Sequence, residues 1–280
     1  MKTVIYYFTG TGNSYSAAAR LCESIGDCIL VPIASLPNDT IVPDGRCAGI
    51  VCPVYDMGLP EIVDSFARRL DIRDTEYVFA VLTMAGVGVS ALHQLDRILK
   101  RRGKGLDGAW TVLMPGNFVP LYSPPTGAKK EKILDRANTR IDTIAGRIKR
   151  GEKIPPAPAP FSSLLWHLLY PGYIRNIERL DEKFWVTDDC IFCRTCAKVC
   201  PVENIEMVDG MPKWLHNCQL CLACMHFCPT DAIQWGSRTE NRGRYLHPEF
   251  GAKKMKRQRP GADNINIQKK GVSGEETTIK

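Results

Sequence analysis

The chain has 280 residues, of which 44% are hydrophobic, 24% are charged and 12 are cysteine. Length and composition exclude disorder throughout, a collagen-like fibre and a small disulfide-stapled fold, and they allow one or two domains with a sizeable core. The formal net charge of +7 at first suggests an acidic partner such as nucleic acid or a membrane surface. The cysteines are a second anomaly, and their spacing carries more information than their number.

The first part of the chain alternates between strand-like and helix-like segments. Apolar runs rich in β-branched or aromatic residues lie at 2–8, 28–33, 47–54, 77–83 and 109–114. Amphipathic patterns typical of helices lie at 14–25, 61–70, 89–102 and 129–150. Continuous apolar strands that alternate with helices indicate a parallel sheet that is buried on both faces. The sequence therefore predicts an α/β fold with a doubly wound, five-stranded parallel sheet over residues 1–152.

The rest of the chain divides at changes of composition. A proline-rich stretch at 155–160 favours an extended, semi-rigid linker. We expect residues 153–184 to connect the α/β domain, through this linker and a helical segment, to a cysteine-rich domain at 185–236. Residues 237–280 form a basic extension, because the chain from 236 on holds 11 Lys and Arg against 5 Asp and Glu. From Gly261 on there is little to bury, so we expect disorder there.

The apolar segments do not have the pattern of a targeting signal or a membrane span. The run at 4–8 ends too early for a signal peptide. The stretch at 161–173 falls short of the roughly 20 apolar residues of a membrane helix. We therefore expect a cytoplasmic protein without a membrane span, in which clustered cysteines serve metal or redox chemistry rather than disulfides. Four cysteines of the first domain are expected to be buried core residues, namely Cys22, Cys28, Cys47 and Cys52.

The other eight cysteines form two copies of one pattern. Each copy reads C-x2-C-x2-C-x3-C-P, and the second begins 28 residues after the first. The first copy contains Cys190, Cys193, Cys196 and Cys200, and the second contains Cys218, Cys221, Cys224 and Cys228. A [4Fe–4S] cube takes four thiolates, and the two-residue gaps let three successive sulfurs reach different iron corners. Structural zinc, the alternative, commonly uses two C-x2-C pairs with a longer spacer and does not need this repeated triple.

This region resembles bacterial-type two-cluster ferredoxins over about 50 residues, with all eight ligand positions present. In that family the fourth cysteine of each copy ligates the cluster of the other copy. The resemblance therefore implies two [4Fe–4S] clusters in a small α+β ferredoxin domain. We name the expected ligand sets cluster I, with Cys190, Cys193, Cys196 and Cys228, and cluster II, with Cys200, Cys218, Cys221 and Cys224. His226 is expected to pack near a cluster rather than to ligate one.

A candidate phosphate site follows the first predicted strand. The segment is rich in glycine and hydroxyl groups and opens a predicted helix, with the residues Thr9, Gly10, Thr11, Gly12, Asn13 and Ser14. Backbone N–H groups, hydroxyls and the positive end of the helix dipole together suit an anion. An ordinary capped helix start is the alternative. The segment is not a Walker A loop, because no Gly-Lys-Ser/Thr follows.

The loop resembles the FMN phosphate loop of flavodoxins, whose T/S-x-T-G-x-T/S pattern is matched by Thr9, Thr11, Gly12 and Ser14. In the flavodoxin-like fold FMN lies at the switch point between strands 1 and 3. The resemblance implies two further flavin-contacting loops, one with Pro53, Val54, Tyr55, Met57 and Gly58, and one with Thr83, Met84, Ala85 and Gly86. The pattern G-x-G-x-x-A at 86–91 is also compatible with a dinucleotide loop, but it follows the fourth strand, and close helix–strand packing is the favoured interpretation.

The two domains and their linker are together similar to the EFR1-type ferredoxin–flavodoxin fusion family over about residues 1–250. Segments 114–118 and 244–248 also resemble that family, and the second is expected to tie the basic extension to the ferredoxin domain. The resemblance implies an electron carrier that relays electrons between FMN, two [4Fe–4S] clusters and a redox protein partner.

Two other functions remain open from the sequence. A flavin-dependent oxidoreductase would act directly on a small molecule or quinone, and a redox sensor or nucleic-acid-binding protein would use the basic extension. Residues 1–235 carry a net charge of +1 and the extension carries the other +6. Eight thiolates with two oxidised cubes would add about −4 and an FMN phosphate about −2, so the assembled protein would be nearly neutral and its charge no longer argues for nucleic acid. The histidines are scattered, and we assign no catalytic residue. The oligomeric state is not readable from the sequence.

Overall fold

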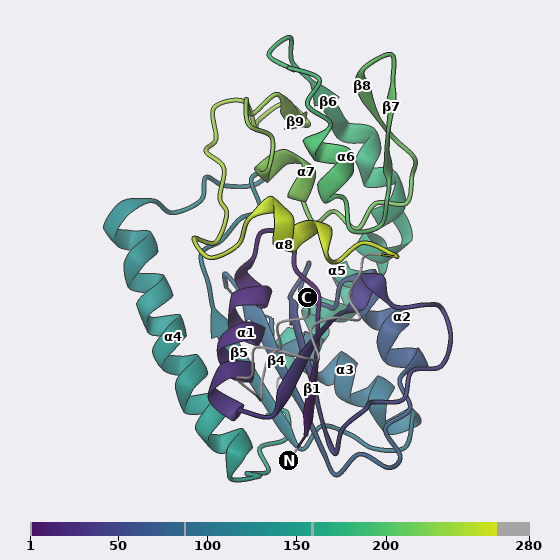
Figure 1. Ribbon diagram of the computed structural model, residues 1–280, viewed down its shortest axis with the longest axis vertical. Coiled ribbons are helices and arrows are strands. Elements are labelled where there is room, and N and C mark those ends of the chain that lie inside the picture. Colours follow the sequence, from purple (N-terminus) through teal and green to yellow (C-terminus); the bar gives the residue numbers. More distant parts are fainter. Residues whose placement is uncertain (1, 87, 158–159, 262–280) are drawn as a thin grey trace, which may run out of the picture.

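The computed structural model describes residues 2–86, 88–157 and 160–261. An α/β lobe is built from the first 150 or so residues, and a small cysteine-rich lobe lies over the carboxyl ends of its strands (Figure 1). The two lobes are joined by one long connection and by a C-terminal segment that runs back between them (Figure 1).

The α/β lobe is organised around one parallel sheet with the strand order β2-β1-β3-β4-β5. This is the order of flavodoxin-like folds, so the predicted fold class is confirmed. The strands differ from the predicted apolar runs by at most one residue at either end, and they are β1 (Thr3–Tyr7), β2 (Cys28–Pro32), β3 (Cys47–Pro53), β4 (Tyr77–Met84) and β5 (Gly108–Leu113).

Two helices cover each face of this sheet. On one face lie α1 (Asn13–Ile25) and α4 (Gly127–Lys149), and on the other lie α2 (Glu61–Arg69) and α3 (Val89–Arg101) (Figure 1). A 3-10 helix, η1 (Ile33–Ser35), follows β2. Each long helix turns a stripe of apolar residues toward the strands, as Ile141, Ile144 and Ile148 do in α4. Helical periodicity in the sequence predicts this stripe, because residues three and four apart share one face.

The cysteines of the α/β lobe do not all match their prediction. Cys47 and Cys52 are buried in β3, as expected. Cys22 and Cys28, however, are half-buried and joined in a disulfide, which corrects the expectation that both are free core residues. The turn after α1 explains the pairing, because Gly26 adopts a φ of 98° there and reverses the chain within six residues. Sequence spacing alone does not show this reversal.

The connection between the lobes is mainly helical. Ile154 forms a parallel bridge with Gly108 beside β5, and then α5 (Pro160–Asn176) and η2 (Ile177–Lys183) lead to the second lobe. Pro160 opens α5, where its missing N–H has no intrahelical partner to lose. Residues 158–159 of the predicted linker lie outside the described residues. Among the described residues, no helix is long and apolar enough to cross a membrane.

The cysteine-rich lobe has the small α+β architecture that the sequence predicts. Two antiparallel strand pairs frame it, β6 (Phe184–Val186) with β9 (Ile233–Trp235) and β7 (Ile205–Val208) with β8 (Met211–Trp214). Two short helices, α6 (Thr195–Val199) and α7 (Ala223–His226), lie between them. Stacking of Phe184 on Trp214, with ring centroids 5.1 Å apart, closes one side of its core.

The first part of the basic extension is folded against the protein. After β9 the chain passes through α8 (Ala252–Lys256), which lies between the two lobes (Figure 1). Residues 244–248 are expected to contact the ferredoxin domain, and in the structure they contact the α/β lobe as well. Arg244 donates to the carbonyl of Ile233 (3.0 Å), whereas the Tyr245 hydroxyl donates to Asn13 Oδ1 (2.7 Å). The disorder predicted from Gly261 on concerns residues 262–280, which lie outside the described residues.

Phe79 provides a test of this core. Its ring is fully buried and packs on Gly49, where a Cβ would lie 2.3 Å from the ring. We expect Phe79→Ala to lower the free energy of unfolding by about 3–5 kcal/mol, because the lost burial leaves a cavity. Leu113→Ala, at the 58% exposed end of β5, should change it by less than about 0.5 kcal/mol. Chemical denaturation measures both variants, and equal effects would contradict this description of the core.

Candidate functional site

A cavity of about 540 Å³ lies at the carboxyl ends of the strands, between the two lobes. This volume is within the range of small-molecule sites, roughly 300–1,000 Å³. The three loops that the sequence singled out meet here. All of the predicted flavin-contacting residues line the cavity except Gly12 and Gly58: Thr9, Gly10, Thr11, Asn13, Ser14, Pro53, Val54, Tyr55, Met57, Thr83, Met84, Ala85 and Gly86.

The segment after β1 has the features of an anion-binding loop. Gly12 adopts a φ of 101° at the start of α1, and no side chain caps this helix or places an acidic group in its first turn. The Gly12 N–H donates to Thr9 Oγ1 (3.0 Å), so the loop folds on itself. Ser14 and Thr83 share a hydroxyl hydrogen bond of 2.7 Å, which joins this loop to the end of β4. An uncapped helix start with nearby hydroxyls suits a phosphate.

The two glycines outside the lining are needed for close approach. A Cβ at Gly12 would lie 2.4 Å from Phe250, and one at Gly58 would lie 2.1 Å from the ring of Tyr170. Gly58 also closes a two-residue turn with Tyr55, in which Asp56 and Met57 both have positive φ. Such a turn folds back sharply and brings the side chain of Tyr55 to the cavity.

The nearby glycine pattern at 86–91 has a packing role in this structure. A Cβ at Gly88 would lie 2.7 Å from the side chain of Val54 and 3.2 Å from the sulfur of Met84. Glycine therefore lets the start of α3 approach the loops after β3 and β4. This agrees with the favoured interpretation of that pattern.

Part of the cavity wall was not predicted as flavin-contacting. Pro115, Asn117, Phe118, Leu121 and Tyr122 follow β5, Tyr173 and Leu180 come from the connection, and Leu220, Cys221, Leu222 and Trp235 come from the cysteine-rich lobe. The segment at 114–118 carried a family resemblance but no assigned role. The others carry no local signal, because they reach the cavity only through the packing of the two lobes.

The eight patterned cysteines surround two small cavities. One is lined by Cys190, Cys193, Cys196 and Cys228, and the other by Cys200, Cys218, Cys221 and Cys224. The structure thus brings together the two sets that the sequence named, each with one cysteine from the other copy. In the described part of the chain, no three His, Cys, Asp or Glu side chains converge closely enough to hold a single metal ion. Each set of four lines one small cavity, and four is the number of thiolates that a [4Fe–4S] cube takes.

The backbone repeats along with the cysteines. Non-glycine residues with positive φ occur in pairs 28 residues apart, as Phe192 with Leu220, Arg194 with Leu222, and Glu203 with Asp231. This left-handed conformation is uncommon for residues with a side chain. It winds each loop around its cavity and aims backbone N–H groups at sulfur, for example Leu220 N at Cys218 Sγ and Asn204 N at Cys200 Sγ, both at 3.2 Å. Such donors stabilise thiolates that ligate a cluster.

The two cysteine sets differ in exposure. Cys193 is exposed, whereas Cys200, Cys218 and Cys224 are buried. Burial raises the pKa of the Cys196 thiol to about 11 and that of Cys221 to about 12, so without a ligated metal both stay protonated at neutral pH. Positively charged iron would offset this penalty on ligation. The four cysteines that line each cavity are the donors that a [4Fe–4S] cluster takes.

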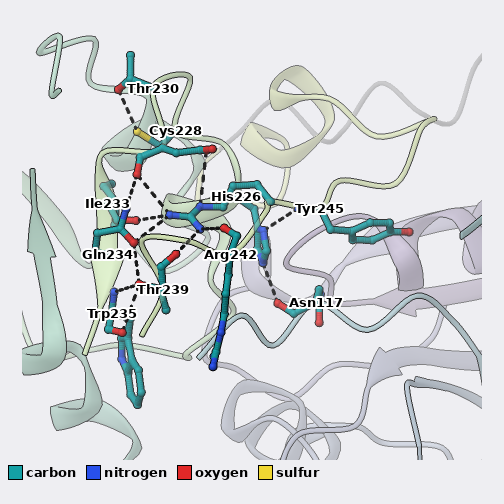
Figure 2. A network of polar contacts seen from close by, with 12 residues as sticks. Asn117, His226, Cys228, Thr230, Ile233, Gln234, Trp235, Thr239, Arg242 and Tyr245 are labelled. Carbon is teal, nitrogen blue, oxygen red and sulfur yellow. Dashed lines mark hydrogen bonds and ion pairs between the residues drawn. The ribbon is translucent and has the colours of Figure 1, made fainter. Parts of the chain in front are cut away.

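A hydrogen-bond network joins the cysteine-rich lobe to the cavity. Figure 2 shows His226 between Asn117 and Tyr245, with one ring nitrogen 2.9 Å from the Asn117 carbonyl and the other accepting from Tyr245 N at 3.1 Å. Burial lowers the pKa of His226 to about 4, so the ring is neutral. Both nitrogens are occupied, and His226 does not face the sulfurs as a ligand. Asn117 in turn donates to Thr11 Oγ1 (2.6 Å), within the candidate phosphate loop after β1.

Comparison with known proteins identifies the second lobe. Residues 175–235 match the family model of a 4Fe-4S dicluster domain. No curated protein matches the chain.

Among solved structures, the chain is similar to an FMN-dependent NADH-azoreductase from Bacillus anthracis in complex with FMN, at 10% identity over 53% of this chain and 100% of that one, with a TM-score of 0.40. It is also similar to Megasphaera elsdenii flavodoxin, at 18% identity over 49% of this chain and 98% of that one, with a TM-score of 0.35. Rubredoxin oxygen:oxidoreductase from Desulfovibrio gigas shares 19% identity over 54% of this chain and 36% of that one, with a TM-score of 0.36. The strand order and the family match together show that this chain joins a flavodoxin-like α/β domain to a 4Fe-4S domain.

Proposed function

We propose that the protein is an electron-transfer iron–sulfur flavoprotein, with FMN in the 540 Å³ cavity and two [4Fe–4S] clusters in the second lobe. One observation carries this proposal: Cys221 lines both the large cavity and the cavity of cluster II. Two redox sites that share a wall are placed for direct exchange of electrons. The EFR1-type fusion family, which the sequence resembles, has the same two parts.

The residues of the large cavity divide into two groups by chemistry. Thr9, Thr11, Asn13 and Ser14 would hold the phosphate of FMN through hydroxyl and backbone groups at the start of α1. Tyr55 and Tyr173 line the rest of the cavity. Burial raises the pKa of both hydroxyls well above the ordinary value, so the cavity has neutral tyrosines around the flavin ring.

The positions of the two cysteine sets indicate an order for the electron transfer. Cluster II would be held by the buried set beside the large cavity, and cluster I by the set that includes the exposed Cys193. When bound, FMN takes up two electrons and releases them singly, and each cluster carries one. The chain holds the three sites at fixed positions, so exchange is intramolecular. A redox protein partner would dock near Cys193.

The packed C-terminal segment weakens the case for a nucleic-acid-binding tail. Lys254 lies over the ring of Tyr15 at 5.0 Å and donates to the Glu249 carbonyl at 2.6 Å. Arg259 pairs with Glu203 of the cysteine-rich lobe. These basic groups have partners within the protein, whereas Lys253, Lys256 and Arg257 are exposed.

Cofactor content tests the proposal directly. After anaerobic purification and reconstitution, we expect about eight irons, about eight sulfides and one FMN per chain. Iron, acid-labile sulfide and extracted flavin measure these three quantities. Fewer than about seven irons would contradict two intact cubes, and a chain that binds no flavin under these conditions would contradict the FMN assignment.

The cysteine sets can be tested one at a time. We expect Cys190→Ser to reduce the iron content from about eight to about four, because cluster I loses a thiolate while the set of cluster II is complete. Cys52→Ala is the matched control, since Cys52 is a buried cysteine of β3 outside both sets. It should retain about eight irons. If Cys52→Ala lost iron as Cys190→Ser does, the assignment of ligands would be wrong.

The wall between the two sites can be tested at Gly10. A Cβ there would lie 2.2 Å from the backbone oxygen of Cys221, so Gly10→Ala forces the lobes apart. We expect it to lower the free energy of unfolding of the holoprotein by about 1–3 kcal/mol, as overpacking does. Gly86→Ala lines the same cavity, but its Cβ meets nothing within 4 Å. Anaerobic urea denaturation should separate the variants, and equal stabilities would rule out the close contact.

A further inference from the structure

The C-terminal segment contacts the anion-binding loop through one fully buried amide. Gln258 has no exposed surface, and Thr9 is 1% exposed. The Gln258 Nε2 donates to the Thr9 carbonyl at 3.0 Å, and its Oε1 accepts from the Thr9 N–H at 3.1 Å. A primary amide can donate and accept at once, so Gln258 pairs with Thr9 as a neighbouring strand would. The two bonds fix the peptide groups on both sides of Thr9.

The same segment holds the loop at three more points. The Tyr245 hydroxyl donates to Asn13 Oδ1 (2.7 Å), and His247 N donates to the Thr11 carbonyl (2.9 Å). Phe250 packs where Gly12 lacks a side chain. Helix α1 has no side-chain cap of its own, and the loop before it is held by contacts from 230 or more residues away in the chain.

The C-terminal segment also contacts the cysteine-rich lobe. Phe250 and Met255 belong to one apolar cluster with Val199, Ala223 and Phe227 of the cysteine-rich lobe. Tyr245 N also donates to His226, which lies between two cysteines of the pattern (Figure 2). The segment that contacts the loop is therefore itself packed against the cysteine-rich lobe.

We propose that Gln258 and Tyr245 are positioning residues for the flavin phosphate: they hold the loop at Thr9 and Asn13 in the conformation that binds it. This inference rests on the proposed binding of FMN. The hydrogen bonds reach the loop for the phosphate and not the walls around the ring, where Tyr55 and Tyr173 lie. Their loss should therefore weaken the binding of FMN and spare riboflavin, which lacks the phosphate.

The test compares the two flavins on the full-length, flavin-free chain with its clusters intact. Gln258→Met keeps the length of the side chain but removes both hydrogen bonds to Thr9, together with the contact between Gln258 Nε2 and the sulfur of Met255 (2.9 Å). We expect its dissociation constant for FMN to rise about 10- to 100-fold, as for the loss of two buried hydrogen bonds. Its dissociation constant for riboflavin should stay within about twofold of the wild-type value. Lys253→Ala, an exposed position on α8, is the control and should bind both flavins normally. Quenching of flavin fluorescence measures each constant.

Tyr245→Phe provides a second, milder variant. It keeps the ring and removes only the bond to Asn13, so we expect a rise of a few-fold for FMN alone. Iron content confirms that each variant is folded. Equal weakening of FMN and riboflavin would show a general structural role, and unchanged FMN binding in both variants would show no role; either result overturns the inference. A wild-type chain that binds neither flavin contradicts the proposed function itself, which separates the two failures.

Discussion

The approach of Gly10 to the backbone of Cys221 is the contact on which the arrangement of the two lobes depends. A glycine here lets the loop after β1 and the cysteine loop share one wall, because any side chain would collide with a carbonyl oxygen. In the proposed function, that wall separates the flavin from cluster II. Other contacts join the same two lobes, such as the Ile62 N–H at the start of α2, which donates to Gln219 Oε1 at 2.9 Å.

The cysteine loops achieve their shape at a cost in backbone energy. Six residues with side chains adopt the left-handed conformation in matching positions of the two copies, and each such residue costs of order 1–3 kcal/mol. Without a cluster, the buried protonated thiols form no favourable charge interactions that would offset this cost in backbone energy. Ligation of a cluster is therefore expected to contribute to the folding of this lobe as well as to its chemistry.

Periodicity and spacing predicted most of the fold and the local parts of the site. Strand bounds followed from apolar runs. Spacing revealed the two cysteine triples, whereas the exchange of the fourth cysteines between the two sets was implied by the resemblance to two-cluster ferredoxins. The disulfide between Cys22 and Cys28 was missed, because it depends on a chain reversal at Gly26. Trp235 and Gln258 were missed as neighbours of the predicted flavin loops for a related reason: their positions follow from lobe packing, which leaves no periodic trace in the sequence.

The cavity wall is assembled from residues spread between Thr9 and Trp235, and Thr9 is held by Gln258. During synthesis the sheet of the α/β lobe leaves the ribosome long before the opposite wall exists, and N-terminal domains generally fold first. A nascent chain of 150 residues thus has an open flavodoxin-like domain with an unsupported loop. Completion of the proposed flavin site therefore waits for Gln258, which is synthesised after all the residues that line the cavity.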